Sequence, residues 1–227
     1  MPEYPQPITT VDVALFTIRD GRLHLALIRR ENEPFAGVLA LPGGFVHTEG
    51  DLGTADTAMR VLRAKARTEV PYLEQLYTFS GPHRDPRGWS ISVAYYALVP
   101  SEALQSGGEG GLTLAPVDAL PKLPFDHGEI VAKALERLRD KASYSSLPAF
   151  LMPPVFSLSQ LQEVYEKVMG AKLERSHFRR AVESTGFAVP IPNLTVNSKG
   201  RPAQAYRLGT HVLHEMAQSL VRRDKQA

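Results

Sequence analysis

Apolar and polar residues alternate along the first part of the chain in short runs that predict β-strands. Residues 8–30 read ITTVDVALFTIRDGRLHLALIRR and divide into two apolar runs at Asp20-Gly21, a dipeptide typical of a tight hairpin. Further runs with strand composition cover residues 39–46, where Pro42-Gly43-Gly44 interrupts the pattern, and residues 72–79 and 90–99. Together these runs predict a β-sheet.

Helical spacing appears twice beside the predicted strands. An apolar stripe at steps of three and four predicts an amphipathic helix after the Gly-Gly turn, with Asp51 or Thr54 as its cap. The stripe consists of Leu52, Ala55, Met59, Leu62 and Ala66. A second helix is expected from about Asp126 to Lys141, with Asp126 as its cap or as an acid–base partner of His127. We therefore predict an α/β (α+β) domain, a mixed sheet with flanking helices, over residues 1–148.

Residues 149–227 predict a smaller unit with a different pattern. Ser157 and Gln160 form a capping-box pair ahead of an apolar helical stripe that ends at Gly170. A short turn leads to a second helix, from about Ser176 to Thr185, and then to two strand-like runs around a basic turn at 197–202. Two helices followed by a hairpin are typical of a winged helix-turn-helix. A last helix is expected over residues 211–223, with Val212, Met216 and Leu220 facing inward.

Composition and charge narrow the class of protein. The chain has 227 residues, no cysteine and no apolar run of membrane-spanning length, and its N-terminus lacks the pattern of a signal peptide, so we expect a cytoplasmic protein without a membrane partner. The net charge of +2 is unevenly divided. Residues 1–150 carry a net charge of −3 and residues 151–227 one of +5. Such a split suggests that the C-terminal part meets a polyanion.

The predicted second helix and wing carry the basic residues expected at a DNA interface. Arginine and lysine neutralise phosphates, and a helix in the major groove presents arginine to guanine. The alternative is a basic face that only solvent covers. The candidate DNA-binding residues are Arg175, Ser176, His177, Arg179, Arg180, Lys199 and Arg201.

The first part of the chain carries candidates for a ligand site. The loop RDPRGW at 84–89 holds two arginines, which suit diphosphate oxygens, and the only tryptophan. The alternative is a surface loop with an Arg–Asp pair. The candidate ligand-binding residues are Arg29, Arg30, Phe45, Arg84, Arg87 and Trp89. The seven histidines are scattered, and we expect no metal site.

Residues 43–68, GGFVHTEGDLGTADTAMRVLRAKART, resemble a Nudix box that has lost its metal-binding glutamates. Gly43, Gly44 and Arg60 are present. The box has glutamate where this chain has Val61, Ala64 and Lys65, and glycine where it has Arg67, and the loop before Arg60 is two residues longer than in the box. A lysine on the metal-facing side would repel Mg²⁺. We therefore expect no catalytic residues and no enzymatic activity.

The whole chain resembles the Nudix-related transcriptional regulators, the NrtR family, over about residues 8–208. The segments that carry the resemblance include ALPGGFV (40–46), FDHGEIVAKALERLRDKASYSS (125–146) and GRPAQAYRL (200–208). The resemblance implies a Nudix-fold domain that binds a small nucleotide effector, ADP-ribose being the expected one, and a winged helix that binds palindromic operator DNA as a homodimer. It also implies repression of NAD-metabolism genes, with no cofactor required.

Two other functions stay open at this point. One is an active Nudix hydrolase of ADP-ribose or another nucleoside diphosphate derivative, with a metal site built from Glu49, Asp51 or Glu69. The other is a ligand-binding module whose winged helix contacts protein.

Overall fold

The computed structural model describes residues 6–104, 111–198 and 201–221. The chain divides into two compact units. One, here called the sheet unit, consists of Met1–Thr17 and His24–Leu135, and the other, the winged unit, of Ile18–Leu23 and Glu136–Ala227. The division falls inside helix α2 (His127–Ala142).

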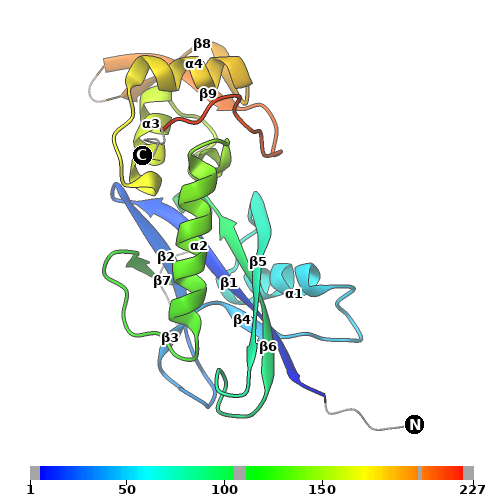
Figure 1. Ribbon diagram of the computed structural model, residues 1–227. Coiled ribbons are helices and arrows are strands. Elements are labelled where there is room, and N and C mark those ends of the chain that lie inside the picture. Colours follow the sequence, from blue (N-terminus) through cyan, green and yellow to red (C-terminus); the bar gives the residue numbers. More distant parts are fainter. Residues whose placement is uncertain (1–5, 105–110, 199–200, 222–227) are drawn as a thin grey trace, which may run out of the picture. The chain divides into compact units, whose positions relative to one another are not determined.

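A mixed β-sheet forms the centre of the sheet unit (Figure 1). Its main path runs β3-β2-β1-β6-β5, with β4 paired to β1 and β7 to β2. Strand β1 runs parallel to β6 and antiparallel to β4, which confirms the predicted mixed sheet. Strand β7 was not predicted because it has only four residues. The strands are β1 (Ile8–Arg19), β2 (Arg22–Arg29), β3 (Leu39–Ala40), β4 (Gly43–Phe45), β5 (Tyr72–Gly81), β6 (Ser90–Leu98) and β7 (Thr113–Pro116).

Both faces of β1 are buried, because successive side chains of a strand point to opposite sides. Val11, Val13 and Leu15 pack in one cluster with residues of α1 (Thr54–Val61) and of the π-helical turn η1 (Leu62–Ala66) that continues it. On the other face, Asp12 meets His127, the first residue of α2. A short 3₁₀ turn, η2 (Ser101–Ala103), follows β6.

The predicted apolar stripe of α1 was right at its end, where Leu62 and Ala66 are buried, and wrong at its start. Leu52 is fully exposed and Ala55 is exposed, whereas the buried residues are Thr57, Ala58, Val61, Leu62 and Ala66. The reason is that Leu52 precedes the helix, which begins at Thr54 with Gly53 as its N-cap and no side-chain capping bond. Asp51 does not cap the helix either. Its carboxylate accepts hydrogen bonds from the Thr57 hydroxyl and the Arg60 guanidinium.

The winged unit begins with the packed 3₁₀ segment η3 (Leu147–Leu151), whose residues are all buried. Helix α3 (Leu158–Met169) starts with the predicted capping box between Ser157 and Gln160. Helix α4 (Arg175–Thr185) follows, and β8 (Ala188–Ser198) pairs antiparallel with β9 (Arg201–Leu208). This is the predicted winged helix-turn-helix (Figure 1).

The helix predicted after residue 210 was wrong, because the chain between residues 211 and 221 is irregular. It is held by backbone hydrogen bonds to residues 143–146, among them Met216 N–H to the Tyr144 carbonyl (2.7 Å) and Leu220 N–H to the Ser143 carbonyl (2.7 Å). Met216 and Leu220 are buried as expected, but Val212 is exposed. Within the described part of the chain, no helix is long and apolar enough to cross a membrane.

Candidate functional site

A cavity of about 740 Å³ opens in the sheet unit, a volume within the range of roughly 300–1,000 Å³ that small-molecule sites occupy. Three parts of the chain supply its charged wall: the end of β2, the η1 turn and the loop between β5 and β6. Six lining side chains are cationic, namely Arg29, Arg30, Lys65, Arg67, Arg84 and Arg87. Four are carboxylates, namely Asp12, Glu31, Glu33 and Asp85. The charge of the wall therefore favours an anionic ligand.

Asp12 is the buried centre of a polar network at the floor of this cavity. Its carboxylate accepts a hydrogen bond from the Ser92 hydroxyl (2.6 Å) and lies 3.4 Å from His127 Nε2 and 3.7 Å from Arg84 Nη2. The Leu41 amide donates to His127 Nδ1 (3.1 Å), so the ring carries its proton on Nε2, facing Asp12. Burial raises the pKa of Asp12, but His127, Ser92 and Arg84 lower it by more, and the net pKa lies below the ordinary value.

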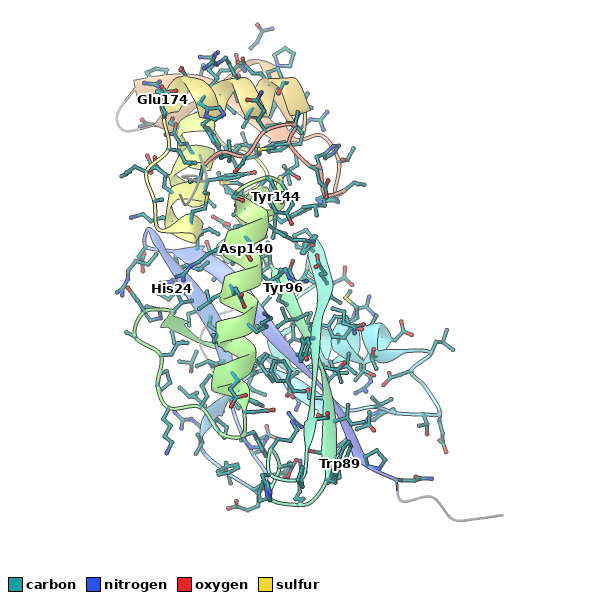
Figure 2. All side chains as sticks on the ribbon, viewed as in Figure 1. His24, Trp89, Tyr96, Asp140, Tyr144 and Glu174 are labelled. Carbon is teal, nitrogen blue, oxygen red and sulfur yellow. The ribbon has the colours of Figure 1, made fainter. Side chains whose placement is uncertain are left out.

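Five of the six sequence-predicted ligand residues line this one cavity: Arg29, Arg30, Phe45, Arg84 and Arg87. The sixth, Trp89, does not. It lies just before β6, half exposed, away from Tyr96 farther along that strand (Figure 2). Asp12, His127 and Phe125 also line the cavity but were not among the predicted ligand residues, and the Phe125 ring lies 4.8 Å from the Arg30 guanidinium carbon. No local motif marks them, because their partners are far away in the sequence.

The two arginines of the 84–89 loop are already paired with carboxylates. Arg84 makes two hydrogen bonds of 2.8 Å to Asp126, and Arg87 contacts Asp85 at 3.0 and 2.6 Å. The Asp126 carboxylate is therefore bound to Arg84 and not to His127. The Arg–Asp pair expected of a plain surface loop is present, but the loop also forms part of the cavity wall.

Three other cations of the wall donate to backbone carbonyls instead. Arg29 donates to the Gly37 carbonyl (2.5 Å), Arg30 to that of Pro34 (2.8 Å), and Lys65 to that of Gly43 (2.5 Å). A carbonyl satisfies a donor without cancelling its charge. Burial and then the charge of Arg30 lower the pKa of Lys65, and burial and then Arg87 lower that of Arg30.

The positions where a Nudix box has glutamate have different surroundings. Val61 is 2% exposed and packs against β4, whereas Ala64 and Lys65 line the cavity. Arg67, where the box has glycine, has a left-handed backbone with φ of 48°. None of the carboxylates considered for a substitute metal site (Glu49, Asp51 and Glu69) lines the cavity. Within the described residues, no group of three or more His, Asp or Glu side chains is placed to hold a metal ion.

Helix α4 presents the candidate nucleic-acid interface. Phe178 and Val182 are buried on its inner face. The Phe178 ring packs edge-on against Tyr165 of α3, with 5.1 Å between the ring centroids. Glu174 caps its start (Figure 2) and accepts hydrogen bonds from the amides of Ser176 and His177. The backbone and side-chain hydrogen bonds from Ser176, with that from His177, lower the pKa of Glu174 to about 2. The capping fixes the helix that carries the basic residues.

The predicted DNA-binding residues of α4 lie at its surface. Arg175, Ser176, Arg179 and Arg180 are exposed, and His177 is half-buried. Arg179 pairs with Glu183 (2.8 Å), four residues on, and the Ser176 hydroxyl is bonded to Glu174 (2.7 Å). In the wing, Arg201 begins β9, whereas Lys199 lies outside the described residues.

A second hollow, of about 840 Å³, lies along one flank of α4. His177, Arg180, Ala181 and Ser184 form one side, and residues 216–221 form the other. Lys172 and Glu174 contribute from the turn before the helix. The sequence predicted neither this groove nor Lys172 as one of its residues, because the segment opposite α4 was expected to be a helix.

Two family models match the chain, one in each of its two parts. A NUDIX domain model matches residues 8–137, and the NrtR DNA-binding winged helix domain matches residues 148–208. The chain is 40% identical over 210 residues to the ADPR responsive transcriptional repressor NtrR of Acinetobacter baylyi, covering 90% of this chain and 83% of that protein.

Solved structures of an NrtR protein are among those similar to this chain. Shewanella oneidensis NrtR complexed with a 27mer DNA matches with a TM-score of 0.87 and 36% identity over 94% of this chain and 99% of that one. The NUDIX domain of the same protein complexed with ADP ribose matches with a TM-score of 0.54 and 36% identity over 60% of this chain and 90% of that one. With a cationic cavity in a Nudix fold and an exposed basic helix in a winged unit, the chain belongs to the NrtR family of Nudix-related transcriptional regulators.

Proposed function

We propose that this chain is a ligand-responsive transcriptional repressor of NAD-metabolism genes that binds operator DNA through α4 and the wing. The observation that carries the proposal is the presence in one chain of an exposed basic helix on a winged fold and of a cavity with uncancelled positive charge. Residues 149–227 would bind the DNA and residues 1–148 would sense the ligand. Such a protein works in the cytoplasm, where it reaches the chromosome.

ADP-ribose is the effector we propose. The Acinetobacter relative is named as ADPR responsive, and the Shewanella NUDIX domain was solved with ADP ribose. The cavity suits such a ligand, because Arg29, Arg30 and Lys65 offer charge to a diphosphate and Phe45 offers an aromatic face. Phe45 is 48% exposed and therefore accessible to a ring of the ligand.

The regulation we propose requires two copies of the chain. A homodimer places two recognition helices on half-sites about one helical turn apart, which favours a palindromic operator. The effector changes DNA affinity only if it binds the DNA-competent and DNA-incompetent dimers with different affinity.

The test uses the full chain and a labelled fragment of the promoter of its own or neighbouring genes. Fluorescence anisotropy should show binding that ADP-ribose shifts, together with a dimer by light scattering. Arg179→Ala should weaken binding about tenfold, because a base or phosphate contact by arginine contributes about 1–3 kcal/mol. Arg139→Ala on the exposed surface of α2 is the matched control and should bind as the wild type does. Failure of the intact protein to bind any such fragment would favour a protein-contacting module instead.

We also propose that the Nudix fold is catalytically inactive in this chain. Ala64 and Lys65 place a methyl group and an ammonium in the cavity where the box has carboxylates, and Val61 is buried. Incubation of the protein with ADP-ribose and Mg²⁺ should release no AMP. Release of AMP that Glu49→Gln abolishes would establish the hydrolase alternative.

A further inference from the structure

The cavity does not suit the divalent ion that a Nudix box holds. Mg²⁺ takes oxygen ligands, usually carboxylates. Of the four carboxylates in the wall, Asp12 is engaged by Ser92, His127 and Arg84, and both oxygens of Asp85 are engaged by Arg87. The other two, Glu31 and Glu33, belong to no group of three His, Asp or Glu side chains that could hold a metal ion within the described part of the chain. The η1 turn contributes Ala64 and the cation Lys65 to the cavity. The Lys65 ammonium therefore already supplies positive charge in the cavity, as a metal ion would.

Lys65 and Arg30, like Arg29, are cations of the cavity wall that keep their charge available for an anion. Each donates to a backbone carbonyl, so neither charge is cancelled by the bond it makes. Burial and then the positive charge of Arg30 lower the pKa of Lys65, so the Lys65 ammonium and the Arg30 guanidinium repel each other. A bound diphosphate would relieve that repulsion, whereas a carboxylate-paired side chain such as Arg84 gains less.

We propose that Lys65 takes the place of the metal ion, so that this chain binds the diphosphate of its effector through Lys65 and Arg30 without a divalent cation. The inference rests on the proposed function as far as the effector is ADP-ribose, but the anion site itself does not depend on that choice. Lys65 is then a specificity-determining residue, because it selects ligands that carry adjacent phosphates.

The experiment measures binding of ADP-ribose and of inorganic pyrophosphate to the full chain by calorimetry, in EDTA and in Mg²⁺. Wild-type affinity for both probes should be the same or tighter in EDTA. Lys65→Ala should weaken both about ten- to hundredfold, because hydrogen bonds to charged groups contribute about 1.5–3 kcal/mol. Lys65→Arg should keep the affinity within a few fold.

A matched control lies two residues away on the same turn. Arg63 pairs with Glu69 at 3.3 Å, is exposed and does not line the cavity, so Arg63→Ala should bind both probes as the wild type does. Lys65→Glu should bind poorly in EDTA and recover part of its affinity in Mg²⁺, which a purely structural role of Lys65 would not produce.

The outcomes separate this inference from the proposed function. Wild-type binding that EDTA abolishes, or Lys65→Ala binding that equals Arg63→Ala, would overturn the role of Lys65 even if ADP-ribose is the effector. Pyrophosphate binding that depends on Lys65, with no binding of ADP-ribose, would support the anion site and overturn the effector.

Discussion

Replacing Asp12 by asparagine tests the buried network at the floor of the cavity. The asparagine keeps the shape of the side chain but removes its negative charge. The Asp12 carboxylate accepts a hydrogen bond from the Ser92 hydroxyl (2.6 Å) and lies 3.4 Å from His127 and 3.7 Å from Arg84. Hydrogen bonds to charged groups contribute about 1.5–3 kcal/mol and neutral ones about 1 kcal/mol. Arg84 keeps its two bonds to Asp126, so the loss should stay near 2 kcal/mol instead of the larger cost of an unpaired buried charge.

Urea unfolding followed by the fluorescence of the single tryptophan measures this loss in the sheet unit, where Trp89 lies. With a slope of about 2 kcal/mol per molar urea, the midpoint should fall by about 1 M. Glu49→Gln, an exposed change in the same unit, is the control and should leave the midpoint unchanged.

The pH dependence gives a second check of the same network. The folded pKa of Asp12 is lowered, so its contribution is present above the unfolded value of about 4 and is lost as the pH falls through the folded pKa. The gap between wild type and Asp12→Asn should be constant from pH 8 to 5 and should narrow below about 4. A midpoint shift under about 0.2 M at pH 7, or a gap that persists undiminished at pH 3, would refute the reasoning.

Four further substitutions have defined outcomes. Gly43→Ala should destabilise the sheet unit by about 1–3 kcal/mol in urea unfolding, because a Cβ there would lie 2.1 Å from Asp12 Oδ1. Gly44→Ala meets only Val61 Cγ2 at 3.1 Å and should cost less, and equal losses would contradict the packing. Arg67→Gly should stabilise by up to about 1 kcal/mol, since it relieves a left-handed backbone, while weakening ADP-ribose binding in calorimetry. Phe178→Ala should destabilise the winged unit by about 3–5 kcal/mol and abolish operator binding in anisotropy while ADP-ribose still binds. Retained operator affinity would show that α4 is not the contact helix.

Features that depend on neighbouring residues could be predicted from the sequence. Asp20-Gly21 marks the β1–β2 turn, and the capping box between Ser157 and Gln160 marks the start of α3. Gly170 and Gly186 end α3 and α4 in the left-handed conformation that glycine adopts without strain. The winged helix-turn-helix followed from these signals in order.

Features that depend on distant partners could not be predicted. The spacing of Met216 and Leu220 suits a helix, but the backbone of that segment bonds to residues 143–146 instead. Leu52 is exposed because α1 begins only at Thr54, and no capping side chain in the preceding loop marks that start. Arginines at the ends of strands indicated the cavity wall, whereas its floor joins Asp12 to His127 across more than a hundred residues.

Val61 limits which side chains this position of the box can hold. It occupies the first of the three altered glutamate positions, is 2% exposed, and presses against Gly44 of β4. A glutamate at this position would bury a carboxylate in apolar surroundings. That burial costs several kcal/mol of folding free energy. A Val61→Glu variant of this chain should therefore lose stability whether or not a metal ion is supplied.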